Sequence, residues 1–234
     1  MNYQIDLLTK VFPGKSSAGA LGLSTCALLR APGHTLLFDT AAHGVIKTIQ
    51  NSLARLEVAP ETVDTIFLSH MHYDHAAYYP NAQIIVGRSE WEYATTSKDE
   101  WTPLESVLYL QHCRQVRLVD DGEEILPGIR AIWTPGHTPG HMSLAVDTPN
   151  GVVVLAGDAV KNRSELELEY SDQYVEPAPP ASKRLSRWLI RFCLATTAIC
   201  WFRTEKSFLS KNWFWTLCFR ADVWTATTAY TICQ

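Results

Sequence analysis

The sequence lacks three features that would place it in a membrane, secreted or cysteine-based class. No stretch reaches the roughly 18 consecutive apolar residues of a membrane-spanning helix, because the longest candidate, residues 189–202, is shorter and contains Arg191. The N-terminal residues show no basic region followed by an apolar run, the pattern of a secretory signal. None of the six cysteines forms a C-x-x-C pair, the spacing of zinc knuckles and thioredoxin-like sites. We therefore expect no membrane span, reduced thiols and a cytoplasmic location.

A basic excess is also missing. The chain carries 20 Lys and Arg against 24 Asp and Glu, a net charge of -4, whereas a general nucleic-acid binder normally presents a basic stripe. We expect no nucleic-acid partner. The 234 residues, 47% of them hydrophobic, fit a globular domain with a sizeable core. The sequence leaves the oligomeric state open, and a homodimer is compatible with it.

Three residue types disappear toward the C-terminus: no histidine follows His141, no glycine follows Gly157 and no proline follows Pro180. Residues 182–234 hold eight Lys and Arg against two Asp and Glu, together with five of the eight tryptophans. We therefore divide the chain into a domain at 1–181 and an atypical basic, Trp- and Cys-rich segment at 182–234. This segment is expected to pack as helices on or beside the domain, with residues 189–202 forming one helix. A reading-frame shift or truncation is the alternative origin of this composition.

Short apolar runs separated by Gly, Ser and Pro dominate the first 160 residues and predict strands. Residues 44–58 instead place Val45, Ile49 and Leu53 on one face at helical spacing, which predicts an amphipathic helix. A second helix is expected to begin with a capping box of Ser89 and Glu92. The predicted strands include residues 3–8, 25–31, 34–40, 63–69, 83–87 and a hairpin turning at 149–151.

The segment "SHMHYDHAA", residues 69–77, crowds His70, His72, Asp74 and His75 directly after a predicted strand. Imidazole and carboxylate together suit Zn, Fe or Mn. In an extended segment His70, His72 and Asp74 would point the same way and His75 elsewhere, so that different pairs could bind different metals. The composition gives this H-x-H-x-D-H pattern by chance in roughly one chain in two thousand, which favours a metal site over a solvated loop.

Two later strand ends offer further ligands: His137 in "TPGHTPGH" (134–141) and Asp158 in "LAGDA". Each alone is typical of a turn, but loops at strand ends are where sites are usually built. We expect His141 to be a structural or supporting residue, and Asp39 to fix loop backbone or orient a ligand. Solvated histidines are expected at His34, His43 and His112.

The order of these motifs resembles the metallo-β-lactamase superfamily over about residues 3–175. The segment "LLFDT" (36–40) is also similar to an early strand of that family, although Ala41 stands where a glycine often follows. The resemblance implies an α/β fold, an αββα four-layer sandwich with a dinuclear metal site along one edge. It makes His70, His72 and His137 the ligands of the first metal.

The same resemblance assigns Asp74 and His75 to the second metal and makes Asp158 the bridging ligand. It implies two Zn²⁺ per chain and a metal-bound hydroxide as nucleophile, because a metal pair lowers the pKa of bound water. Asp74 would carry the proton to the leaving group. The implied activity is that of a zinc-dependent hydrolase of a small molecule.

The segments around the motifs look most like N-acyl homoserine lactonases, which implies opening of a lactone or related ester, and thereby quorum quenching. A groove for the acyl chain could use Tyr78, Tyr79, Trp91 and Tyr93, although aromatics beside a helix are more often core. This chain departs from that group in two ways. Lys161 stands where the lactonases carry a tyrosine, and no histidine after His141 can complete the second metal site. The second metal is therefore expected to be weak or absent.

Two alternatives stay open. A thioester hydrolase of the glyoxalase II type would use the same ligands. A degenerate metal-binding protein with a crippled second site would bind one metal and turn over nothing. Flavodiiron-like oxidoreductases are disfavoured, because they carry glutamate where His72 stands and need a flavin domain. Nucleic-acid-processing relatives are disfavoured by the missing inserted domain and the acidic main body.

Overall fold

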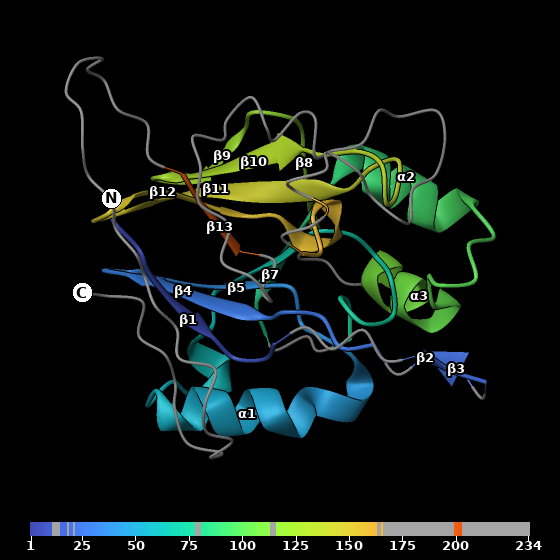
Figure 1. Ribbon diagram of the computed structural model, residues 1–234, viewed down its shortest axis with the longest axis horizontal. Coiled ribbons are helices and arrows are strands. Elements are labelled where there is room, and N and C mark those ends of the chain that lie inside the picture. Colours follow the sequence, from blue (N-terminus) through green and yellow to red (C-terminus); the bar gives the residue numbers. More distant parts are fainter. Residues whose placement is uncertain are drawn as a thin grey trace.

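Two β-sheets packed face to face form the centre of the computed structural model (Figure 1). It describes residues 1–10, 15–17, 19–20, 22–77, 81–112, 116–162, 165 and 199–202. The first sheet has the order β1-β4-β5-β6-β7-β8 and the second the order β13-β12-β11-β10-β9, and β2 pairs with β3 separately. The strands are β1 Gln4–Leu7, β2 Lys15–Ser16, β3 Gly19–Ala20, β4 Ala27–Ala31, β5 His34–Phe38, β6 Thr65–Leu68, β7 Gln83–Gly87, β8 Val116–Val119, β9 Glu124–Leu126, β10 Ile129–Trp133, β11 Met142–Thr148, β12 Gly151–Leu155 and β13 Ile199–Phe202.

Strand direction brings the motif-bearing loops to one edge. β5, β6 and β7 are parallel neighbours, so their carboxyl ends lie on the same side of the first sheet. β10 and β12 are both antiparallel to β11, so their carboxyl ends also share one side. The Met142 N–H donates to the Ser69 carbonyl at 2.9 Å, which joins the two sheets at this edge.

The space between the sheets is filled by alternating apolar side chains. In β5, Leu36 and Phe38 belong to the cluster between the sheets, whereas Leu37 belongs to the cluster beneath the helices. In β6, Phe67 faces the second sheet and Ile66 and Leu68 face the helices. This strand is buried on both faces, as its continuous apolar run predicts.

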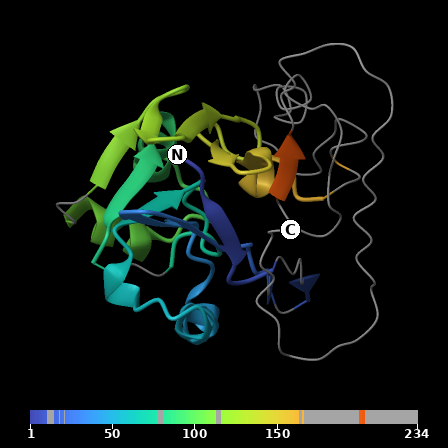
Figure 2. The same ribbon diagram turned by 90° about the vertical axis from the view of Figure 1, so that its left-hand side faces the viewer.

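Three α-helices pack on the outer face of the first sheet, through side chains that include Leu53, Ala94 and Leu110. Figure 1 shows α1 on the side of β4 and β5 that faces away from the second sheet, and Figure 2 shows the same helix end-on. The described residues thus form three of the four expected layers. The helices are α1 Ile46–Arg55, α2 Arg88–Thr96 and α3 Leu104–His112, with short 3-10 turns at His43–Val45, Pro60–Thr62 and Gly157–Ala159.

The predicted strands and the amphipathic helix are confirmed, but two expectations are wrong. Gly87 is the N-cap of α2 and no side chain caps the helix, because Ser89 already lies inside its first turn; there is no capping box with Glu92. Residues Ile199–Phe202 pair with β12 as a strand, where a helix was predicted. The rest of the 182–234 segment lies outside the described residues. Within those residues, no helix is long and apolar enough to cross a membrane.

Candidate metal centre

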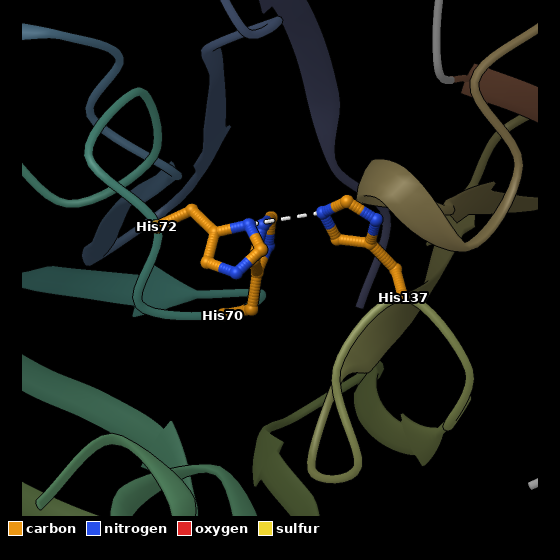
Figure 3. A group of neighbouring side chains, drawn as sticks. All are labelled: His70, His72 and His137. Atoms are coloured by element: carbon orange, nitrogen blue, oxygen red, sulfur yellow. Dashed lines mark hydrogen bonds between the residues drawn. The ribbon is translucent and has the colours of Figure 1, made fainter. Parts of the chain in front are cut away.

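Three histidines predicted as first-metal ligands converge at the shared sheet edge. Figure 3 shows His70 and His72 from the segment after β6 facing His137 from the loop after β10. One ring nitrogen from each lies within 4.8 Å of the others. His72 Nδ1 is 3.0 Å from His137 Nε2, and the buried Nε2 of His70 has no hydrogen-bond partner. We call these three residues the first triad.

Hydrogen bonds from outside the triad set which nitrogen of each ring is available. Ser69 Oγ donates to Asp39 Oδ2, so it accepts from the Nδ1–H of His70 at 3.0 Å and leaves a lone pair on Nε2. His72 donates its Nε2–H to Asp99 Oδ2 at 2.9 Å, which leaves Nδ1 toward His137. The same bond lowers the pKa of Asp99 to about 2. Such carboxylate partners orient metal-binding histidines.

Burial keeps two members of the triad neutral. Desolvation lowers the pKa of His70 well below its usual value, and the neighbouring histidines act in the same direction. Desolvation also lowers the pKa of His137 to about 4, although Asp158 opposes it. Neutral imidazoles with free lone pairs are the form that binds a metal ion.

A second group forms around His75, whose Nδ1 lies 2.8 Å from Asp39 Oδ2. Its Nε2 faces Asp158 Oδ1 at 3.3 Å and Asp74 Oδ1 at 3.9 Å, and ligand atoms of His70, His75 and Asp158 also lie within 4.8 Å of one another. Desolvation lowers the pKa of His75, but the carboxylates of Asp158, Asp39 and Asp74 outweigh it and raise the pKa well above its usual value. The space at His75 Nε2 therefore attracts a positive charge.

Asp158 faces both groups. Its Oδ1 lies 3.3 Å from His75 Nε2 and its Oδ2 lies 3.4 Å from His137 Nε2. Burial raises the pKa of this carboxyl, but its interaction with the His75 imidazole outweighs burial and lowers it. An ionised carboxylate with one oxygen toward each group has the geometry expected of a bridging ligand.

Asp74 lies at the edge of the second group, outside the ligand atoms of His70, His75 and Asp158 that lie within 4.8 Å of one another. Its side chain is 19% exposed and reaches only to 3.9 Å from His75 Nε2. The argument from strand alternation is wrong here, because the chain turns after His70 and the His75 N–H donates to the His72 carbonyl at 3.0 Å. This turn brings His75, expected to point elsewhere, into contact with His70, their ring centroids 4.0 Å apart.

Two supporting residues behave as the sequence predicted. Asp39 fixes loop backbone by accepting the Ser69 N–H at 2.7 Å, and it also holds His75. The Nε2 of buried His141 accepts the Asp158 N–H at 3.2 Å, which is a structural rather than a ligand position. His43 and His112 are exposed, as expected, and His34 is half-buried.

Two carboxylates beside the first triad were not predicted from the sequence. Asp99, held by Tyr93 and the Trp101 N–H, orients His72. Glu90 in α2 is fully buried beside the ligand loops. Of the other aromatic residues proposed for a groove, Trp91 packs against the core under the helices. Tyr78 and Tyr79 lie outside the described residues.

The donors present fit a pair of divalent transition-metal ions. Imidazole nitrogens with carboxylate oxygens suit Zn, Fe and Mn. The Nε2 atoms of His70 and His75 are buried without a hydrogen-bond partner, and a metal ion would satisfy both. Unpaired buried polar atoms are costly, so their pairing by a metal is the simplest account of this arrangement.

The family model of the metallo-beta-lactamase superfamily matches residues 19–192. The chain belongs to the metallo-β-lactamase superfamily. The match extends past the predicted boundary at residue 181 and ends at residue 192. Membership in the superfamily confirms the expected fold, and metal binding is typical of the family.

Its relatives include N-acyl homoserine lactonases. One from Bacillus sp is 34% identical over 153 residues, 61% of this chain and 58% of the relative, and one from Bacillus cereus is 32% identical over 59% and 56%. The chain thus spans less than two thirds of the length of these curated relatives. A solved quorum-quenching N-acyl homoserine lactone lactonase has a TM-score of 0.66 at 27% identity, covering 80% of this chain and 88% of that one. A variant of B. thuringiensis AiiA with N-decanoyl-L-homoserine bound has the same TM-score at 26% identity, covering 80% and 89%.

Proposed function

We propose that the chain is a metal-dependent hydrolase that opens the ring of an N-acyl homoserine lactone. One observation carries the proposal: two groups of metal-ligand side chains meet at one sheet edge with Asp158 facing both. Some relatives are named as lactonases, which supports a lactone as the substrate of this hydrolase.

In this proposal the first triad would hold one Zn²⁺, Asp74 and His75 would hold a second, and Asp158 would be available to both. When bound, the ions lower the pKa of a water molecule and polarise the lactone carbonyl. Ser69 and Asp99 each hold one ring nitrogen, of His70 and His72 respectively, and leave the other available to a metal ion. Asp39 does the same for His75.

Asp74 is the residue proposed to move a proton. It lies at the rim, partly exposed, with Oδ1 near His75 Nε2. The water oxygen attacks the carbonyl carbon and gives its proton to an Asp74 carboxylate oxygen. The bond between the carbonyl carbon and the ring oxygen then breaks, and the ring oxygen takes the proton from Asp74. The product is the open N-acyl homoserine.

The second ion is proposed to bind more weakly than the first. The chain contains no histidine after His141, so only Asp74, His75 and Asp158 are assigned to it. Catalytic zinc commonly has three protein ligands and a water, which makes occupancy of such a site compatible with turnover.

The test is a substrate panel with metal-loaded and chelator-treated protein: N-hexanoyl-L-homoserine lactone, a glutathione thioester and a β-lactam. We expect lactone hydrolysis that disappears on chelation and returns with Zn²⁺. Asp74→Asn should lower kcat on the lactone by about 10²-fold or more, whereas Asp147→Asn, at an exposed position of β11, should not. Faster thioester hydrolysis would favour the glyoxalase II-type activity. One bound metal without turnover would favour the degenerate metal-binding protein.

A further inference from the structure

Glu90 connects the two loops that carry the first triad. It lies in the first turn of α2, directly after β7, and its side chain is fully buried. Its Oε1 accepts the Met71 N–H at 2.9 Å, and its Oε2 accepts the Thr138 hydroxyl at 2.5 Å. Burying a carboxylate costs free energy, and these two hydrogen bonds offset part of that cost.

The two partners of Glu90 are the chain neighbours of all three triad residues. Met71 lies between His70 and His72, and Thr138 follows His137. The histidines come from different sheets, so their relative placement depends on contacts between the two loops. Glu90 reaches both loops through one rigid carboxylate.

The backbone around Glu90 is packed too closely to move independently. A Cβ atom on Gly140 would lie 1.9 Å from the Glu90 nitrogen, and one on Gly87 would lie 2.6 Å from Met142 Sδ. The loop that carries His137 therefore rests directly on the start of α2. Only glycine allows this approach.

We propose that Glu90 is a positioning residue that sets the spacing of His72 and His137, and thereby the affinity and geometry of the first metal site. This inference rests on the proposed metal centre, but not on the lactone as substrate. Glu90 touches neither substrate nor metal in this account. It acts through Met71 and Thr138.

The partners of Glu90 predict which substitutions it tolerates. In Glu90→Gln the amide oxygen can still accept the Met71 N–H, and the amide NH₂ can donate to Thr138 Oγ1, because a hydroxyl both donates and accepts. Glu90→Ala loses both bonds. Thr138→Val keeps the side-chain shape and loses only the bond to the second loop.

The test is titration of the metal-free full chain with Co²⁺, whose visible absorption spectrum reports the coordination of the ion. We expect Glu90→Ala to weaken binding at the tighter site by about 10–100-fold and to change the spectrum. Thr138→Val should show a smaller change in the same direction. Glu90→Gln should remain within about 3-fold of the parent chain, because its amide can form both hydrogen bonds. Glu92→Ala, an exposed position of the same helix, is the matched control.

The inference would be overturned by unchanged affinity and spectrum in both Glu90→Ala and Thr138→Val, or by equal damage in Glu90→Gln and Glu90→Ala. If Glu90→Ala does not fold, Thr138→Val and Glu90→Gln decide. A parent chain that binds no Co²⁺ would overturn it as well. If the protein binds metal as expected but does not hydrolyse the lactone, only the lactonase proposal fails. The measured affinities then still decide the inference about Glu90.

Discussion

At the scale of single residues, Asp39 shows how a ligand is prepared by its neighbour. The fully buried carboxylate accepts hydrogen bonds from the Ser69 backbone, the Ser69 hydroxyl and His75 Nδ1. It has a positive φ of 57°, a conformation that a non-glycine residue adopts at some cost. Because its Oδ2 accepts from His75 Nδ1, Asp39 leaves Nε2 as the nitrogen of His75 that faces Asp158 and Asp74.

Asp39→Asn is therefore expected to weaken the second metal. One oxygen is replaced by an NH₂ group, which donates and cannot accept, so the remaining oxygen cannot serve all the donors of Ser69 and His75. His75 would shift its proton to Nε2, the atom needed for the metal. We expect about 10–100-fold weaker binding of the second ion, measured by calorimetric Zn²⁺ titration. Asp147→Asn is the control, and unchanged binding of both ions in Asp39→Asn would contradict the role of Asp39.

At the scale of elements, a chain of hydrogen bonds fixes the turn that carries Asp158. His141 Nε2 accepts the Asp158 N–H, and its Nδ1–H therefore donates to Thr134 Oγ1 at 2.9 Å. The Thr134 hydroxyl lies 2.9 Å from Ser143 Oγ, which donates to the Ala156 carbonyl. Both ends of the turn are thus tied to the loop after β10.

Gly157→Ala tests the tightness of this turn. Gly157 has φ +56°, and an added Cβ would lie 2.9 Å from His141 Nε2 and 3.0 Å from Ser69 Oγ. The matched control is Gly33→Ala, which has φ +79° and nothing within 4 Å, so it carries the backbone strain without the contact.

Both glycine variants should lose about 1–3 kcal/mol of unfolding free energy from the positive φ, measured by urea denaturation. Gly157→Ala should lose more than Gly33→Ala and should also bind metal less tightly, because the contact displaces His141 or Ser69. Equal losses in the two variants, with unchanged metal affinity, would contradict the packing described for the turn.

Local sequence patterns predicted most strands and α1, because burial on one or both faces leaves a direct pattern of apolar residues. Helix α3 was missed: Leu104, Leu108 and Tyr109 are exposed while Val107 and Leu110 are buried, so apolar residues surround the helix and blur its period. The capping box at Ser89 failed because β7 runs directly into α2, and Gly87 takes the N-cap position.

The triad residues could be named from the sequence because their motifs resemble those of the superfamily, whereas the residues that support them could not. Glu90 and Asp99 act through tertiary contacts with segments 19 and 27 residues away, and neither has a local pattern of its own. The orientation of His75 also escaped sequence reasoning, since a turn replaces the extended segment that the alternation argument assumed.

At the scale of the whole molecule, the candidate centre draws ligands from both sheets. His70, His72 and His75 follow β6 in the first sheet, and His137 and Asp158 follow β10 and β12 in the second. Metal ions held between them would join the sheets at an edge where the Met142 to Ser69 hydrogen bond already connects them.

Removing the metal should therefore lower the thermal stability of the protein. A ligand present at 100 times its Kd stabilises the folded state by about 2.7 kcal/mol. For a chain of this length that corresponds to a fall in Tm of about 5–10 °C on chelation, measured by calorimetry. Re-addition of Zn²⁺ should restore the Tm, whereas Mg²⁺ should not, because imidazole ligands suit Zn²⁺. An unchanged Tm after verified metal loss would show that the ions do not join the sheets.

The most direct measurement of the central claim is the metal content per chain of His70→Ala and His137→Ala, set against His43→Ala. All three remove one imidazole, but His43 is exposed and distant from the triad in the sequence. We predict that His70→Ala and His137→Ala lose most of the bound metal while His43→Ala keeps the content of the parent chain. Retention of two metal ions in both triad variants would contradict the account.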